Sequence, residues 1–121
     1  MAVILIVEDD VFIREIAELM MEDWGHETPS ASALDEALFI LRSPQRIDAL
    51  FTDIYLKAAV LGGCELAQEA VHIRPELRVL YTTGNSVTDK MKSLFVGGTH
   101  CLCKPYTQHQ LRQSVGTMLA A

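Results

Sequence analysis

Acidic residues gather at two separate points of the 121-residue chain, each at the end of an apolar run. Glu8, Asp9 and Asp10 follow the run Val3–Val7, and Asp53 closes a second run. Carboxylates packed together in a partly buried site must bind protons or share a cation. Because all these ligands are oxygens, a hard divalent ion fits best, and we expect Mg²⁺ here. Helix capping accounts for Asp10, but it says nothing of Asp53 on a different strand.

Two groups suited to anions follow other apolar runs. Lys104 precedes Pro105, and a lysine beside carboxylates can hold a phosphate as a point charge. The proline permits a cis peptide bond, which would direct the lysine side chain into the site. Thr83 offers a hydroxyl to a phosphoryl oxygen. The plainer interpretations are a turn lysine for Lys104, a strand-favouring hydroxyl for Thr83 and a turn residue for Asp53.

The elements that must position these residues alternate along the chain. Apolar runs predict strands over residues 3–7, 27–31, 47–52, 77–82 and 100–103. Helical patterns follow them: one from the cap Asp10 to the stop Gly25, one from Ser32 with Pro44 beyond its end, and one over residues 64–73. The fourth begins at Ser86 or Thr88 and is stopped by Gly97-Gly98, and the last covers residues 107–119, with a capping box predicted from Thr107 and Gln110. This alternation predicts one three-layer α/β domain over residues 1–121, a doubly wound (βα)5 fold with a parallel five-stranded sheet. Ligands of such sheets bind beyond the carboxyl ends of the strands.

Local signals refine this arrangement. Pro29 cannot donate to a strand ladder, so the second strand is expected at a sheet edge. Gly62 and Gly63 are expected in a loop ahead of the third helix. We interpret Phe12 and Trp24 as covered or partly covered positions. The apolar residues that share one face of the first, second and last helices are Phe12, Ile16, Leu19 and Met20; Leu34, Leu38 and Leu41; and Leu111, Val115, Met118 and Leu119.

Composition excludes several classes of protein. Ten basic against sixteen acidic residues give a net charge of −6, which disfavours nucleic acid. No apolar run approaches the ~20 residues of a membrane span, and the N-terminus lacks the basic flank of a secretory signal. Cys64, Cys101 and Cys103 are odd in number and lack metal-ligand spacing. We therefore expect buried free thiols in a reduced, cytoplasmic chain.

Four short motifs together resemble the receiver domains of two-component response regulators. They are Val7-Glu8-Asp9-Asp10, Thr52-Asp53-Ile54, Tyr81-Thr82-Thr83-Gly84 and Cys103-Lys104-Pro105-Tyr106. They occur in the family's order and span essentially the whole chain. The resemblance implies a single-domain, CheY-like protein with the flavodoxin-like strand order 2-1-3-4-5.

The resemblance also implies roles for individual residues. Asp53 is expected to accept a phosphoryl group from a phosphohistidine. Mg²⁺ is expected on Glu8, Asp9, Asp53 and the backbone carbonyl of Tyr55. Thr83 and Lys104 are expected to contact the phosphoryl oxygens. This assignment agrees with the need of phosphoryl transfer for positioning and charge neutralisation.

Position 101 departs from the family pattern. An aromatic residue is usual three positions before the lysine, and this chain has Cys101. In the family, that aromatic ring and the threonine move together and report phosphorylation on the face formed by the fourth helix, the fifth strand and the fifth helix. A cysteine cannot act as the same steric switch. We therefore expect either a muted conformational change on that face or a switch that uses another residue, such as Tyr81 or Tyr106.

The loop after Asp53 departs as well. Lys57 stands where many members have proline, so the rim of the site is more basic and less rigid. Residues 57–63 also contain about one extra residue. We interpret Lys57 itself as a solvated loop lysine. Tyr55 and Asn85 stand two positions after Asp53 and Thr83 and flank the phosphoryl group in the family. A bulky Tyr55 is expected to shield the acyl phosphate and to slow autodephosphorylation.

The expected function is therefore a phosphoacceptor switch rather than an enzyme. Its expected partners are a sensor histidine kinase or a histidine phosphotransfer protein and an unknown downstream protein, with neither nucleic acid nor membrane. The chain is expected to be a monomer or a weak homodimer. The first alternative is a receiver-like module that does not depend on phosphorylation. An aspartate-nucleophile phosphatase would need an acid where Tyr55 stands, and a flavin carrier would need a hydroxyl- and glycine-rich loop after the first strand.

Overall fold

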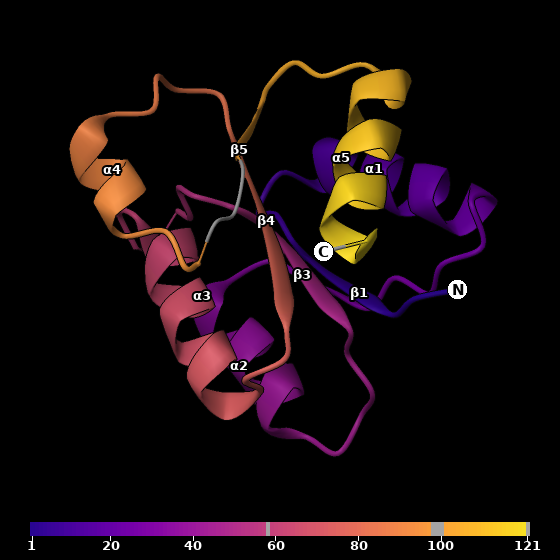
Figure 1. The fold of residues 1–121 in the computed structure, drawn as a ribbon, viewed down its shortest axis with the longest axis horizontal. Coiled ribbons are helices and arrows are strands. Elements are labelled where there is room, and N and C mark those ends of the chain that lie inside the picture. The colour runs from indigo at the N-terminus through magenta and orange to yellow at the C-terminus, as the bar shows by residue number, and fades with distance from the viewer. Residues whose placement is uncertain (58, 98–100, 121) are drawn as a thin grey trace.

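The computed structural model of the protein describes residues 1–57, 59–97 and 101–120. Strand and helix alternate five times in the described chain (Figure 1). The elements are β1 (Ile4–Val7), α1 (Val11–Asp23), β2 (Ser30–Ala31), α2 (Leu34–Arg42), β3 (Ala49–Asp53), α3 (Gly62–Ile73), β4 (Arg78–Thr83), α4 (Asp89–Ser93), β5 (Cys101–Cys103) and α5 (Gln108–Ala120). The predicted alternation is confirmed.

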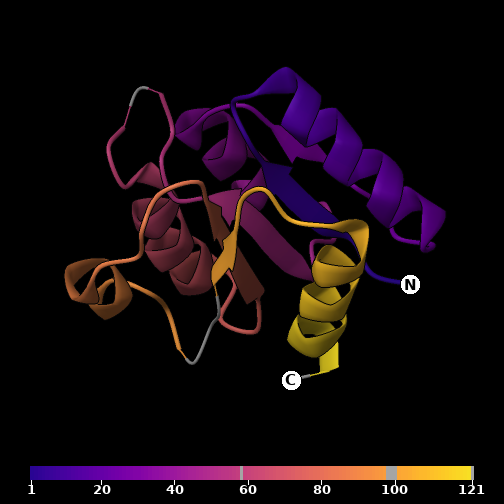
Figure 2. The same cartoon turned by 90° about the horizontal axis from the view of Figure 1, so that it is seen from above.

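The strands form one parallel sheet in the order β2-β1-β3-β4-β5, as predicted. Helices α1 and α5 cover one face, and α2, α3 and α4 lie on the other (Figures 1 and 2). A separate apolar core fills the space between the sheet and each helical layer. This is the three-layer arrangement expected from the sequence.

The inner strand β1 shows why continuous apolar runs predict buried strands. All four of its residues are buried. Successive side chains point to opposite faces of the sheet. Leu5 and Val7 therefore enter the core on the α2–α3 side, whereas Ile4 and Ile6 enter the core against α1 and α5. A strand that is covered on both faces needs apolar residues at every position.

The predicted edge strand is confirmed. β2 is short and pairs only with β1 among the strands of the sheet. Pro29 precedes it, and the Pro29 carbonyl accepts the Ile6 N–H at 2.9 Å. The proline thus contributes an acceptor to the sheet where it has no donor to give.

Helix α1 buries a different stripe from the predicted one. Ala17 and Met21 are buried, whereas Phe12 is 78% and Leu19 67% exposed, so the prediction of a covered Phe12 is wrong. Two adjacent stripes of this helix have the i, i+4, i+7 spacing of an apolar face, and both are apolar. The helix packs against the sheet with the stripe that contains Ala17 and Met21.

Two further predictions need correction. Gly62 and Gly63 form the first turn of α3 rather than a loop before it. Cys103 is exposed and Cys101 only partly buried, so only Cys64 is the buried thiol expected. Cys101 and Cys103 lie on β5, a strand at the edge of the sheet, where cover is incomplete.

The last two helices carry the predicted capping signals. Thr88 caps α4 by accepting the Met91 N–H at 3.1 Å, although α4 ends at Ser93, before its predicted end. Thr107 accepts the Gln110 N–H, and the Gln110 side chain accepts the Thr107 N–H, so the predicted capping box of α5 is present. The predicted start of the fifth strand at residue 100 lies outside the described residues.

Candidate functional site

The carboxyl ends of four strands bring the predicted site residues to one edge of the sheet. Glu8 and Asp9 follow β1 directly, Asp53 is the last residue of β3, and Thr83 is the last residue of β4. Lys104 follows β5 directly. In an open parallel sheet, this edge is where ligands bind. The fold therefore gathers side chains that are far apart in the sequence.

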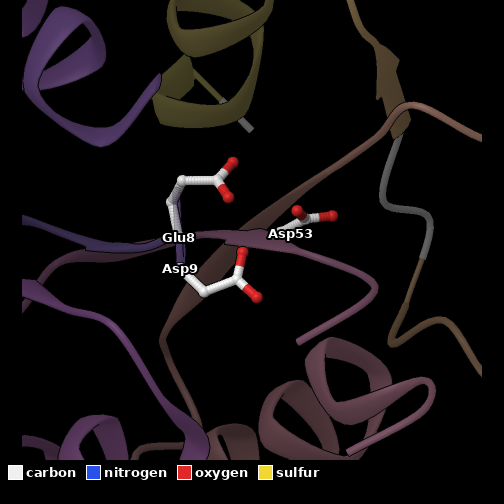
Figure 3. Close-up of side chains that lie close together, drawn as sticks. All are labelled: Glu8, Asp9 and Asp53. Atoms are coloured by element: carbon white, nitrogen blue, oxygen red, sulfur yellow. The ribbon is translucent and has the colours of Figure 1, made fainter. Parts of the chain in front are cut away.

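The three acids of the predicted metal site form a compact cluster. One carboxylate oxygen each from Glu8, Asp9 and Asp53 lies within 4.8 Å of the others, and the three side chains point toward a common centre (Figure 3). Glu8 and Asp53 are buried, and Asp9 is half-buried. An all-oxygen donor set with this charge fits a hard divalent cation such as Mg²⁺.

The Lys104 ammonium links two of these acids. Its Nζ donates to Glu8 Oε1 at 2.6 Å and to Asp53 Oδ2 at 2.9 Å. Since β4 lies between β3 and β5, the lysine side chain crosses the end of β4 to reach Asp53. The Lys104–Pro105 peptide bond is cis, as the sequence permits. Burial lowers the pKa of Lys104, but its hydrogen bonds to both carboxylates outweigh this and raise it, so the ammonium stays charged.

Glu8 is the acid whose protonation is most affected. Burial raises its pKa to about 7, against hydrogen bonds from Lys104 and the Asp10 N–H that lower it. The nearby Asp53 charge raises it further. In the absence of a cation, Glu8 therefore binds a proton far more readily than an ordinary glutamate. A bound cation favours its ionised form.

Backbone amides fix the other two acids. The Tyr55 N–H donates to Asp53 Oδ1 at 3.3 Å, and the Lys57 N–H donates to Asp9 Oδ2 at 2.8 Å. Both donors belong to the segment that follows β3. The side chain of Lys57 is exposed, in agreement with its interpretation as a solvated loop lysine. This segment therefore acts on the site through its main chain.

Thr83 is fully buried at the end of β4, and its hydroxyl accepts the Asn85 N–H at 3.1 Å. Asn85 itself is exposed at the rim. Tyr55 is partly buried, and its hydroxyl donates to the sulfur of Met91 on α4 at 3.9 Å. The two rim positions, Tyr55 and Asn85, therefore differ in exposure, because the Tyr55 side chain packs toward α4 whereas Asn85 is exposed.

Two residues of the site were not predicted from the sequence. Arg14 on α1 donates to the Glu8 carbonyl oxygen at 2.9 Å and so holds the turn after β1. Gly63 lies so close to β3 that an added Cβ would stand 1.9 Å from the Asp53 carbonyl oxygen. The pair of glycines after Asp53 was the available signal for such a close approach.

Comparison with known proteins assigns the chain to a family. The model of the response regulator receiver domain matches residues 4–116. The chain belongs to this family. Receiver domains are phosphoacceptors of two-component systems rather than conventional enzymes, and they bind Mg²⁺ at an acidic pocket. They interact with histidine kinases or phosphotransfer proteins.

Individual relatives agree with this assignment. An uncharacterized transcriptional regulatory protein of Bacillus subtilis, YrkP, is 31% identical over 115 residues, which are 93% of this chain and 47% of the relative. A probable transcriptional regulator of Porphyra purpurea, ycf27, is 27% identical over 96% of this chain and 46% of its own length. The chain thus spans about half the length of the curated relatives it matches.

Solved receiver structures share the whole fold. A response regulator receiver protein from Sinorhizobium medicae is 28% identical, with a TM-score of 0.90 over 99% of this chain and 95% of its own. A receiver domain from Clostridium thermocellum is 26% identical, with a TM-score of 0.83 over 99% and 95% of the two chains. In the part of this receiver that the structure describes, no helix has both the length and the apolar character that crossing a membrane requires.

Proposed function

We propose that residues 1–121 form one cytoplasmic receiver domain in which Asp53 accepts a phosphoryl group from a phosphohistidine. The donor is a sensor histidine kinase or a histidine phosphotransfer protein. The observation that carries this proposal is the contact of Asp53 Oδ2 with the Lys104 ammonium, inside a cluster of three carboxylates. The signal then passes to a downstream protein by contact or by onward phosphotransfer.

The transfer exchanges one bond to phosphorus for another. A carboxylate oxygen of Asp53 forms a bond to phosphorus while the bond between phosphorus and the imidazole nitrogen breaks. The electron pair of that bond returns to the imidazole, which takes up a proton. Negative charge on the three peripheral phosphoryl oxygens must be neutralised throughout, and this need dominates catalysis of phosphoryl transfer.

This chain's own residues supply part of that neutralisation. Lys104 already lies 2.9 Å from the acceptor carboxylate, so its ammonium can move to a phosphoryl oxygen as the charge develops. The Thr83 hydroxyl, which accepts the Asn85 N–H, can donate its own hydrogen to another phosphoryl oxygen. Glu8, Asp9, Asp53 and the Tyr55 carbonyl would hold Mg²⁺, which would supply further positive charge when bound.

Helix α1 offers the donor protein a place to dock. Its exposed apolar side chains are Val11, Phe12, Ile16 and Leu19. A groove of about 530 Å³ lies beside them, with α1 residues on one side and Gly84 and the segment from Lys104 to Tyr106 on the other. A phosphohistidine on another protein must come close to Lys104 to reach Asp53. We therefore assign the apolar face of α1 to contact with the donor protein.

The test is incubation with phosphoramidate and Mg²⁺, followed by intact mass measurement. One added phosphoryl group that is lost in Asp53→Asn is the expected result. Far-ultraviolet circular dichroism of the variant checks that it remains folded. No adduct at saturating phosphoramidate would contradict the proposal and favour a module that works without phosphorylation.

A further inference from the structure

Helix α2 turns a stripe of three large side chains away from the core. Asp35, Phe39 and Arg42 have the spacing i, i+4 and i+7, which places them on one face of the helix. All three are exposed, and the Phe39 ring is 77% exposed. Ala37 and Leu41 of the same helix are buried instead. The stripe is therefore surface that the core of the chain does not use.

The surface beside the Phe39 ring is hollowed. A depression of about 330 Å³ is lined by Asp35, Phe39, Arg42 and Ser43. The same patch thus carries a protruding ring and a hollow next to it. An interface with two-fold symmetry uses one patch on both partners, so the patch must be complementary to itself. A ring beside a hollow meets this condition in shape.

The charges of the stripe meet the same condition. Asp35 stands in the first turn of α2 and Arg42 in its last turn, with Phe39 between them. When two copies of α2 pair antiparallel, Asp35 of each copy comes opposite Arg42 of the other copy. The two Phe39 rings then meet close to the two-fold axis. The stripe is therefore complementary to itself in charge as well as in shape.

Both charges retain capacity for a further partner. Arg42 Nη2 lies 3.5 Å from Glu69 Oε2, and both side chains of this pair are exposed. Asp35 Oδ1 accepts the Glu36 N–H at 2.9 Å. A guanidinium has five donors and a carboxylate accepts at both oxygens, so each group can bind a second copy in addition to these contacts.

The exposed apolar face of α1 lacks this self-complementarity. In α1, all of whose residues the structure describes, the exposed charged residues are Glu15, Glu22 and Asp23, and all three are acidic. Two copies of that face would bring like charges together. α1 and α2 lie on opposite sides of the sheet (Figures 1 and 2). Pairing through α2 therefore leaves the α1 face open to the donor protein.

We propose that two copies of this chain associate through α2, as an antiparallel two-fold dimer centred on Phe39. The Phe39 ring leaves water on association and supplies most of the affinity. The exposed pairs of Asp35 with Arg42 contribute little affinity and fix the orientation. Because α2 has only nine residues and the chain has a net charge of −6, the dimer is weak and forms only as the protein concentration rises.

Sedimentation velocity of the unphosphorylated protein, over about a hundredfold range of concentration, measures this association. The wild type is expected to shift from monomer toward dimer as the concentration rises. Phe39→Ala is expected to weaken association by at least about tenfold. Phe12→Ala removes an equally exposed ring from α1 and is the matched control, expected to associate like the wild type. Far-ultraviolet circular dichroism checks that each variant is folded.

Reversal of the charges tests the antiparallel arrangement. Asp35→Arg places two arginines in each contact, and Arg42→Asp places two aspartates there. Each variant alone is expected to associate at least about tenfold more weakly than the wild type. An equimolar mixture of the two variants is expected to regain dimer, because every contact between unlike copies then joins an arginine to an aspartate.

Four outcomes would overturn the proposal. They are a wild type that stays monomeric throughout, unchanged association in Phe39→Ala, loss of association in Phe12→Ala, and a mixture of Asp35→Arg with Arg42→Asp that associates no better than either variant alone. Since phosphorylation plays no part in these measurements, their result is separate from the test of Asp53 as the phosphoacceptor.

Discussion

Lys104 Nζ lies 2.9 Å from Asp53 Oδ2, although 51 positions separate the two residues in the sequence. Together with the contact of the same Nζ with Glu8 Oε1 at 2.6 Å, it joins the acid cluster to the end of β5 and sets the charge balance of the site. The ammonium faces two buried carboxylates in the resting protein. The same group is available to a phosphoryl oxygen once Asp53 has reacted.

The first prediction concerns this ammonium. Lys104→Met keeps a long side chain but removes the charge. Phosphorylation of Asp53 by phosphoramidate is expected to slow by about 10²-fold, the usual effect of losing one preorganised donor. The rate is measured by intact mass against time. Lys90→Met, which changes an exposed lysine of α4, is expected to react at the wild-type rate, and an equal rate in Lys104→Met would contradict the assigned role.

The second prediction concerns the close approach of α3 to β3. Gly63→Ala places a Cβ against the Asp53 carbonyl oxygen, where there is no room. We expect the free energy of unfolding in urea to fall by about 1–3 kcal/mol. Gly116→Ala is the control, because this position is exposed on α5 and nothing lies within 4 Å of its added Cβ. Removing a helical glycine there is expected to stabilise the protein by about 0.5–1 kcal/mol. Equal effects of the two variants would exclude the close approach.

The third prediction concerns the lifetime of the phosphorylated protein. Tyr55 is partly buried two positions after Asp53, and its ring extends toward Met91. Tyr55→Ala is expected to admit water to the acyl phosphate and to shorten its lifetime severalfold. Tyr55→Phe keeps the ring and is expected to retain most of the lifetime. The decay is followed by intact mass after removal of phosphoramidate, and an unchanged lifetime in Tyr55→Ala would show that the ring does not shield the phosphoryl group.

The fourth prediction concerns the apolar face of α1. Phe12 is 78% exposed on α1, and Phe39 is 77% exposed on α2, which makes them a matched pair. Phe12→Ala is expected to slow phosphotransfer from a purified phosphohistidine donor protein by at least about tenfold, the effect of losing an aromatic anchor at an interface. Its reaction with phosphoramidate is expected to stay at the wild-type rate. If Phe39→Ala slows transfer from the protein donor as much as Phe12→Ala does, α1 is not the docking face.

The fifth prediction concerns pH and stability away from the site. His26 Nδ1 accepts the Ala2 N–H at 3.1 Å, which requires the neutral ring. Burial and the N-terminal charge hold the pKa of His26 below its usual value of 6.5. At His26 the unfolded chain therefore binds more protons near that pH, and this residue's contribution to the free energy of unfolding falls as pH decreases through 6.5, whereas the raised pKa of Glu8, about 7, contributes in the opposite direction.

Urea unfolding at about pH 7.5 and about pH 5.5 measures this effect. His26→Asn, whose side-chain oxygen can still accept the amide, keeps Glu8, so its difference from the wild type isolates the histidine. The variant is expected to gain stability relative to the wild type as the pH falls from the higher value to the lower. His109→Asn, at an exposed position of α5, is the control and is expected to follow the wild type. A wild-type slope in His26→Asn would show that His26 does not contribute to it.

Much of the fold follows from local patterns. The all-apolar run of β1 predicted a strand covered on both faces, and Pro29 predicted an edge strand; both are confirmed. The capping box of Thr107 and Gln110 is also confirmed. These features depend on interactions within a few residues or on the side-chain period of one element, so the sequence contains them directly. The four motifs then identified the family and the order of the strands.

The tertiary structure alone decided which of several locally equivalent choices is realised. On α1, two stripes fit the helical period, and only packing against the sheet decided that Ala17 is buried and Phe12 is not. Gly63 became significant because α3 crosses so close to Asp53. Tyr81, rather than Tyr106, shares the face of Thr83 because of strand register and alternation. Periodicity specifies which residues of one element lie together, whereas contacts between elements depend on the shapes that meet across the core.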